Sequence, residues 1–465
     1  MPKAIFALRR KPVTLLGAIL AALAAVLIVL LSLIALAGHG GGLWLQLIAY
    51  ALLPALLVFA VVVMLLGLWW QRRRERRAAA GGAAPPLPVV DLNDRATRRT
   101  LLAALLLAGV GLVILAGAGL RGVNVLESPT FCTQACHTIM QPEATSHARS
   151  AHANVTCAEC HIGPGLKWFV KSKINGTLEL IEIAENATPR PIPAPIHNLR
   201  AARIVCEQCH SAREFIADRL IVRTHYGEDA ANTPVKTVLM LHVGGDSGGA
   251  SSGAHWHASH ANQVRYLADP TRETVYAVEL TTAGGKPQTF KTDAAPPAAA
   301  QWRTMDCVDC HNRAAHPFGT PAAEVDAALA DGRIDSSLPF IKREALRVLK
   351  AEYPSQNEAR MAISREITSF YGTNYADQAE SHATAVKAAG KTLGDLWAAN
   401  VFPQMKVTWN TYVDQLGHQQ SPGCLRCHDN KHVAADGAKI SKSCGLCHHV
   451  VAEDEAAPEA LKALE

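Results

Sequence analysis

Residues 131–161 read FCTQACHTIMQPEATSHARSAHANVTCAECH. In this stretch two cysteine pairs end directly in histidine, Cys132/Cys136-His137 and Cys157/Cys160-His161. The first pair has one extra residue between its cysteines, and the second has the spacing C-x-x-C-H. Further along the chain the C-x-x-C-H pattern recurs and uses up the remaining cysteines of the twelve: Cys206/Cys209-His210, Cys307/Cys310-His311, Cys424/Cys427-His428 and Cys444/Cys447-His448.

C-x-x-C-H is the spacing that attaches c-type haem, in which both thiols form thioethers and the histidine binds the iron. Structural zinc also uses Cys and His, but it needs four ligands, usually from two paired knuckles. A disulfide framework is typical of short secreted domains, and thioredoxin-like pairs do not come in sixes. We therefore interpret the six motifs as six covalently bound haem c groups, with the motif histidines as proximal ligands.

A low-spin, six-coordinate iron needs a second axial ligand as well. The chain has twenty histidines, of which six are in the motifs and one, His39, lies among the apolar segments. The remaining thirteen are enough for bis-histidine ligation of most haems, although the sequence does not assign the pairs. The leading candidates lie in the haem-rich stretches: His152, His197, His225, His255, His257, His316, His418 and His432.

Three long apolar runs without a charged residue, 14–37, 43–70 and 101–120, precede the motifs. Each can cross a bilayer core of about 30 Å as a helix. Lys and Arg lie before the first run, after the second and before the third, whereas the link after the first run carries none. The positive-inside rule therefore predicts a cytoplasmic N-terminus and places everything after Leu120 outside the cytoplasm. The alternative for the first run is a signal peptide, since Ala35-Leu36-Ala37 resembles a cleavage site.

Charge differs between the two parts. Residues 1–120 hold 12 Lys/Arg against 3 Asp/Glu, and the rest of the chain holds 33 against 37. The basic balance thus belongs to the membrane part, and nucleic acid is not an expected partner. The apolar runs lack the facing histidines that a haem inside the bilayer would need, so we expect an anchor. The predicted organisation is an anchor (1–120), a dihaem module with a quinol site (121–200), a multihaem electron-transfer domain (201–450) and an acidic tail (451–465).

The predicted fold class is mainly α. Leu166–Glu185 has the pattern of an amphipathic helix, and residues 321–402 carry apolar side chains at helical spacing. Thr274–Leu280 and Gln288–Thr292 alternate on either side of a glycine turn and predict a β-hairpin. Beyond the helices and this small hairpin, we expect little regular structure in the haem domain.

Phe131–Glu185 resembles the N-terminal module of the NapC/NirT family of membrane-anchored quinol dehydrogenases. The matching residues are Met140 and Pro142, Ser150-Ala-His152, Asn154 to His161, and Pro164 to Lys167 with Lys171 and Lys173. The downstream part resembles a larger subgroup, the ImcH-like inner-membrane multihaem cytochromes of bacteria that respire extracellular acceptors. That likeness rests on His255-Trp256-His257, Cys307–Pro317 and the stretch from Gly417 to His448.

The resemblance implies oxidation of quinol or menaquinol at the outer face of the bacterial inner membrane. Electrons would then pass to periplasmic cytochromes or a reductase, and other membrane subunits can take part. In some relatives a methionine just after the first motif binds the first haem, a role that Met140 matches with one extra residue of spacing. Lysines after the second motif lie near the quinol in relatives, and Lys167 and Lys171 match them. The usual anchor is one span, so three spans are a departure.

Quinol oxidation needs polar groups that bind the ring oxygens and accept two protons. Lys167, Lys171 and Lys173 can polarise the oxygens, with Glu143 as a proton acceptor. The alternative for these lysines is contact with anionic lipid headgroups. Two other functions remain open: a non-catalytic relay subunit of a larger respiratory complex, and the same chain run in reverse as a quinone reductase. A terminal reductase is disfavoured, because no C-x-x-C-K motif is present.

Overall fold

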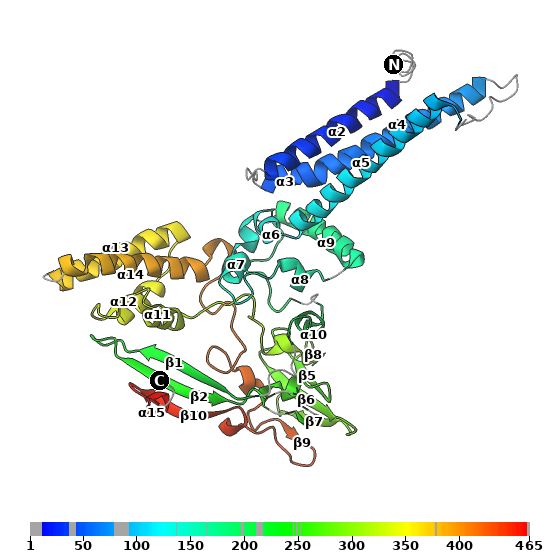
Figure 1. The fold of residues 1–465 in the computed structure, drawn as a ribbon. Coiled ribbons are helices and arrows are strands. Elements are labelled where there is room, and N and C mark those ends of the chain that lie inside the picture. Colours follow the sequence, from blue (N-terminus) through cyan, green and yellow to red (C-terminus); the bar gives the residue numbers. More distant parts are fainter. Residues whose placement is uncertain are drawn as a thin grey trace. The chain divides into compact units, whose positions relative to one another are not determined.

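The computed structural model describes residues 12–36, 43–78, 93–135, 137–163, 165–196, 200–210, 217–244, 246–247, 250–251, 253–376 and 379–462. The chain forms two compact units, Met1–Ala135 and Cys136–Glu465 (Figure 1). Each unit is built around its own apolar side chains, and the two are described in turn.

The described residues of the first unit form helices joined by short turns. Its elements are α2 (Pro12–Leu36), α3 (Leu43–Leu47), the π-helix η1 (Ile48–Leu52), α4 (Leu53–Ala78), α5 (Arg95–Leu126) and α6 (Pro129–Ala135). As the sequence predicts, three helices are long and apolar enough to cross a membrane, with candidate spans Val13–Ile34, Trp44–Glu75 and Gly109–Leu126. The third span begins later than the predicted run 101–120. α2 and α4 pack closely because Gly17 lacks a side chain, and a Cβ there would lie 2.7 Å from the backbone nitrogen of Met64.

The second unit begins with short helices around the motifs: α7 (His137–Ala148), α8 (Cys157–His161), α9 (Leu166–Ala184) and α10 (Ala202–Cys206). α8 starts at a capping box, in which the backbone N–H of Thr156 donates to the Glu159 carboxylate over 2.7 Å. The predicted amphipathic helix after the second motif is confirmed as α9.

Two antiparallel sheets follow. The larger has the order β8 (Gln301–Thr304), β5 (Asn262–Ala268), β6 (Val275–Thr282), β7 (Gln288–Lys291) and β9 (Val433–Ala434). The smaller has the order β1 (Arg219–Tyr226), β2 (Pro234–Leu241) and β10 (His448–Glu455), and the short strands β3 (Asp246–Ser247) and β4 (Ala250–Ser251) form a separate ribbon. The predicted hairpin is β6–β7, in which Val278 pairs with Phe290.

The expectation of little regular structure beyond helices and one hairpin is wrong. Two of the additional strands have pairing partners far along the chain: β9 joins β7, and β10 joins β2. The strands β1 and β5 instead pair with the next strand in sequence, β2 and β6, and they were not predicted from the sequence. The stretch expected to be an acidic tail, residues 451–465, begins inside β10, where Ala452 pairs with Val238. Both of these side chains are buried. A short helix, α15 (Glu459–Lys462), follows.

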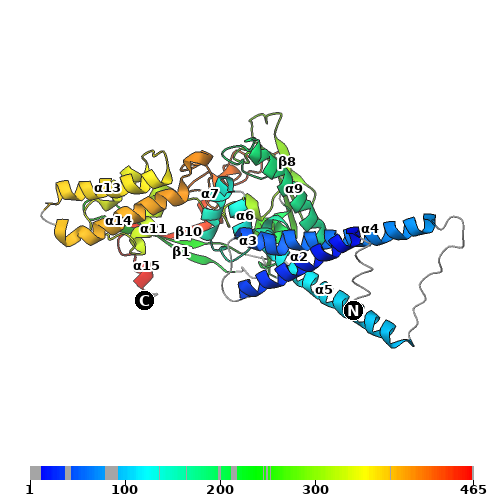
Figure 2. The ribbon, with the colours of Figure 1, turned by 90° about the horizontal axis from the view of Figure 1, so that it is seen from above.

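The helices expected over residues 321–402 are confirmed as α11 (Pro321–Ala330), α12 (Ile341–Leu349), α13 (Gln356–Asn374) and α14 (Ala379–Asn400). α13 and α14 lie side by side as an antiparallel pair (Figure 2). Their shared core contains Ile363, Ile367, Leu393 and Trp397, all buried. Thr320 and Ser355 cap α11 and α13 through their hydroxyl oxygens.

Candidate haem-binding sites

The second to sixth motifs each fold as one tight turn. Three of them form 3-10 turns, η3 (Cys307–Asp309), η6 (Gly423–Arg426) and η7 (Cys444–Leu446). In the fourth motif the backbone N–H of His311 donates to the carbonyl of Cys307 over 2.8 Å, and in the third His210 donates to Cys206 over 2.8 Å. This local hydrogen bond gathers two thiols and an imidazole on a single turn, as attachment of one porphyrin requires.

The predicted haem-binding cysteines differ in their exposure. Cys209, predicted to bind the third haem together with Cys206, is exposed, whereas Cys206 is half-buried. The two stay on one turn, because the N–H of Cys209 donates to the carbonyl of Cys206 over 3.2 Å. Cys424 and Cys444 are exposed as well. The structure thus brings Cys209 to the third site but leaves its side chain exposed, beyond the end of α10. The thioether bond of Cys209 to haem stays a prediction.

Five motif histidines face a second histidine from elsewhere in the chain. The ring centroids of these pairs lie between 5.9 and 6.3 Å apart. The pairs are His161–His316 (6.3 Å), His210–His152 (5.9 Å), His311–His255 (6.3 Å), His428–His257 (5.9 Å) and His448–His418 (6.1 Å).

This spacing fits one metal ion between the two rings. With metal–nitrogen bonds of about 2 Å and ring centres about 1 Å behind each nitrogen, the centroids would lie about 6 Å apart. Aromatic rings in direct contact also lie about 4.5–7 Å apart, but here five motif histidines share nearly the same spacing to a second histidine. The chain therefore holds ten imidazoles in an arrangement that suits bis-histidine haem c.

The second ring nitrogen of several of these histidines is already bound. Nδ1 of His257 lies 2.9 Å from the carbonyl oxygen of Ala254, and Nδ1 of His428 lies 2.9 Å from that of Ser441. Nδ1 of His316 lies 3.1 Å from the carbonyl oxygen of Glu143. Histidines that bind metal commonly donate the other N–H in this way, which fixes the tautomer and leaves Nε2 for the metal.

Burial favours the neutral form of these rings. It lowers the pKa of His255, His257 and His316, because a charged imidazolium is poorly solvated away from water. A neutral imidazole has the free lone pair that iron needs.

The structure places the other predicted ligands differently. His225 lies on β1 with Nδ1 3.4 Å from Asp326, and the buried His432 lies with Nδ1 3.0 Å from Asp429. Within the described residues, neither ring faces a motif histidine. His197 lies outside the described residues, as do Cys136 and the side chain of His137. Met140 lies on α7, partly buried.

Sequence reasoning did not single out His147. Its ring centroid lies 5.9 Å from that of His316. His147 is also close enough to His161 to lower the pKa of that ring, after burial and His316. Two histidines, His147 and His316, thus lie near His161 of the second motif. The sequence signal for His147 was its position between the first two motifs.

Consecutive motifs are neighbours in space. The pKa of the Cys160 thiol is raised by burial and then by Cys206, which links the second motif to the third. The pKa of the Cys206 thiol is lowered to about 7 and that of the Cys307 thiol is raised, in both cases chiefly by the other thiol, which links the third motif to the fourth. Burial raises the pKa of Cys310 and of Cys447 most, and Cys424 raises both further. Cys424 thus links the fifth motif to the fourth and to the sixth. The second to sixth motifs therefore form one row in chain order.

Two backbone segments hold this row together. The segment Cys310–His316 begins with Cys310 and His311 of the fourth motif and ends with His316. Between them, the carbonyl oxygen of Ala314 lies 3.2 Å from Nδ1 of His152. This segment therefore contacts the second, third and fourth sites. At the far end, the N–H of His242 donates to the carbonyl of Cys447 over 2.8 Å.

The residues predicted for a quinol site lie in two surroundings. The Glu143 carboxylate is partly buried, 3.3 Å from Nδ1 of His316. Burial raises the pKa of Glu143, and nearby Arg313 opposes that shift. On α9 the ammonium of Lys171 lies 5.3 Å from the centre of the Trp168 ring, and that of Lys173 lies 4.9 Å from Phe169. Lys167, one residue before Trp168, is exposed.

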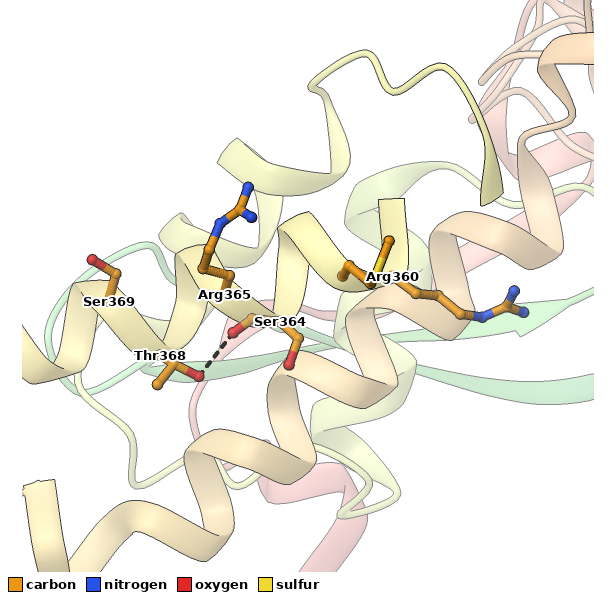
Figure 3. Close-up of a pocket in the computed structure, with 6 residues that line it drawn as sticks. Arg360, Ser364, Arg365, Thr368 and Ser369 are labelled. Carbon is orange, nitrogen blue, oxygen red and sulfur yellow. Dashed lines mark hydrogen bonds between the residues drawn. The ribbon is translucent and has the colours of Figure 1, made fainter. Parts of the chain in front are cut away.

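A shallow hollow on α13 is a separate feature (Figure 3). Its lining comes from one helix and is hydroxylic and basic, with the Thr368 hydroxyl donating to the Ser364 carbonyl over 2.8 Å. The lining residues include no histidine, cysteine or carboxylate. None of the motif histidines or cysteines lies among the lining residues, so we assign no haem to this hollow. The lining residues are Arg360, Met361, Ser364, Arg365, Thr368 and Ser369.

Comparison with known proteins identifies a family and a relative that this chain resembles. The model of the NapC/NirT cytochrome c family, N-terminal region, matches residues 95–190. Over 375 residues the chain is 37% identical to the cytochrome c-type protein ImcH of Geobacter sulfurreducens, covering 79% of this chain and 74% of that protein. No solved structure matches. With transmembrane helices and the cysteine–histidine motifs of c-type haem, the chain belongs to the NapC/NirT family of multihaem cytochromes c.

Proposed function

We propose that this cytochrome is a quinol dehydrogenase. It oxidises quinol, menaquinol in particular, at the outer face of the bacterial inner membrane and passes the electrons to periplasmic cytochromes or a reductase. Each quinol gives up two electrons and two protons. When bound, six haem c groups supply one-electron redox centres. The observation that carries the proposal is the row of paired histidines in a chain with three membrane-spanning helices.

The histidine pairs supply the axial ligands in this proposal. His161, His210, His311, His428 and His448 are proximal, and His316, His152, His255, His257 and His418 are their distal partners in the same order. His137 is the proximal ligand of the first haem, and Met140, three residues later on α7, is the candidate for its distal side. Within the described residues, neither His225 nor His432 faces a motif histidine, so we assign them structural roles beside Asp326 and Asp429.

The row of motifs also suggests a direction of electron transfer. Residues 1–120 anchor the chain with the N-terminus in the cytoplasm, and residues 121–200 form the module that receives electrons. Residues 201–450 conduct them outward in the periplasm. Burial raises the pKa of the Cys310 thiol to about 11 and that of Cys427 to about 12, so the fourth and fifth sites lie inside the row. Leu446 of the sixth motif is exposed, which suits an exit site.

α9 supports a quinol site next to the lipid. Val170, Ile174, Leu178 and Ile181 lie on one face of this helix and are each 46–59% exposed. Such an unpaired apolar stripe, with lysines and Trp168 at its start, suits a helix at the membrane surface. Lys167 and Lys171 can then bind the quinol oxygens, and Glu143, whose pKa burial raises, can accept a proton.

The test uses the purified full-length holoprotein in lipid vesicles. Added menaquinol analogue is expected to reduce its haems, as followed by absorption. Lys171→Gln should slow this reduction about tenfold or more, because the bound ring loses a polarising group. Lys387→Gln, at an exposed lysine on α14, is the matched control and should leave the rate unchanged.

The same measurement separates the alternatives. A chain that dithionite reduces but menaquinol does not is a relay subunit, and the quinol site then belongs to another protein. A chain that reduces quinone from a periplasmic donor faster than it oxidises quinol runs in reverse.

A further inference from the structure

One short turn carries two of the proposed distal ligands. The 3-10 turn η2 (Ala254–Ala258) contains His255, which faces His311 of the fourth motif, and His257, which faces His428 of the fifth. Only Trp256 lies between them in the chain. The fourth and fifth sites are therefore linked through a single residue, and the conformation of this turn sets both ligand positions.

The backbone that directly follows β2 fixes the turn. The N–H of Ala254 donates to the carbonyl of His242 over 2.8 Å, and the N–H of His255 donates to that of Val243 over 2.9 Å. Gly253 precedes the turn with φ +65°, and a Cβ at this position would lie 2.6 Å from the His242 carbonyl oxygen. Backbone contact this close requires glycine.

Trp256 fixes the turn on its other side. Its indole packs against the buried cluster of the larger sheet, which includes Val264 and Tyr266. Its carbonyl accepts a hydrogen bond of 3.0 Å from the Asn262 amide. The Trp256 ring meets that of His257 at 88° with centroids 5.4 Å apart, so the indole restricts rotation of this imidazole.

The fifth pair has the most nearly perpendicular ring planes of the five. His257 and His428 are inclined by 82°. The third and second pairs are inclined by 69° and 61°, and the fourth and sixth by 44° and 34°. Nδ1 of both rings in the fifth pair lies 2.9 Å from a backbone carbonyl oxygen, that of Ala254 or of Ser441. Both planes are therefore held, and they are held almost perpendicular.

We propose that Trp256 is a positioning residue that keeps the imidazole plane of His257 nearly perpendicular to that of His428, and so sets the electronic state of the fifth haem. The inference rests on the proposed ligand pairs. Perpendicular imidazoles leave two iron d orbitals of ferric haem nearly equal in energy, which gives a strongly anisotropic low-spin EPR signal. Nearly parallel rings separate these orbitals and give a rhombic signal. Perpendicular rings also favour the ferrous state.

The test is EPR of the oxidised full-length holoprotein. His257→Met first identifies the signal of the fifth haem as the anisotropic one that it removes. Trp256→Leu should then convert that same signal to a rhombic one and lower the reduction potential of this haem. The matched control is Trp302→Leu on β8 of the same sheet, where the tryptophan is 41% exposed, and it should change neither.

An unchanged anisotropic signal in Trp256→Leu would overturn the role of Trp256. If that variant does not accumulate as holoprotein, Trp256→Met replaces it with the same two outcomes. Failure of the ligand assignment is distinguishable, because His257→Met would then leave every low-spin signal intact. Retention of the signal in Trp256→Phe, which keeps a ring edge against His257, would support the proposal.

Discussion

The imidazole of His152 lies with Nδ1 3.2 Å from the carbonyl oxygen of Ala314. The ring that faces His210 of the third motif is thus held by the segment that follows the fourth motif. His316, two residues beyond Ala314, faces His161 of the second motif. The second, third and fourth sites therefore share the segment Cys310–His316. The effect of removing one ligand on its own haem can be compared with its effect on the haems of the neighbouring sites.

Replacing a distal histidine should convert one haem from low spin to high spin. We expect His316→Ala to retain six covalent haems but to open one axial position, because the thioethers do not depend on the distal ligand. The measurements are pyridine haemochrome content and EPR of the oxidised protein.

His225→Ala is the matched control for this prediction, since His225 pairs with Asp326 rather than with a motif histidine. It should leave six low-spin haems. A new high-spin signal in this variant would show that the ligand assignment is wrong.

The sixth site should serve as the exit for electrons. Cys444→Ala combined with Cys447→Ala should leave five haems and an unchanged rate of reduction by menaquinol, while electron transfer to a periplasmic cytochrome falls at least tenfold. Stopped-flow absorption with each partner separately measures the two rates. Equal slowing of both steps, or of neither, would contradict the proposed direction.

Local patterns in the sequence predicted much of the fold. The apolar runs gave the membrane helices, and helical spacing gave α9 and the helices of residues 321–402. The hairpin β6–β7 followed from alternation around a glycine turn. Each of these elements is determined by neighbouring residues, which is why a single sequence was enough.

The pairing of the histidines could not be predicted, because it depends on contacts between distant segments. His161 meets His316, which lies 155 residues further along the chain (316 − 161). His418 lies nearer in sequence to the fifth motif but faces His448 of the sixth. His432 also follows the fifth motif closely, yet it is buried against Asp429. In all five pairs the motif nearest to the second histidine along the chain is not the motif that it faces.

The apolar stripe of α9 should be needed for quinol access. Leu178→Asp places a charge in the middle of the stripe and should lower the rate of reduction by menaquinol several-fold, because a charged side chain is costly at the lipid boundary. The control is Met361→Asp on α13, where the methionine is 63% exposed and outside the proposed site. Similar rates for both variants would argue against contact of α9 with lipid.

The pair α13–α14 should be sensitive to added methyl groups at its glycines. A Cβ on Gly394 would lie 3.0 Å from the Cα of Arg360, and one on Gly390 would lie 3.0 Å from the Cα of Ser364. Backbone atoms cannot move aside as a flexible side chain can. We therefore expect Gly394→Ala to destabilise this pair by about 1–3 kcal/mol, measured by hydrogen exchange of the α14 amides.

Gly372→Ala on α13 provides the matched control. No heavy atom lies within 4 Å of the Cβ that this substitution would add. Alanine is the better helix former by about 1 kcal/mol, so the variant should be neutral or slightly more protected from exchange. Opposite effects of the same substitution in paired helices would show that close backbone approach, rather than helix propensity, determines the glycines of α14. Equal effects would instead assign both changes to propensity.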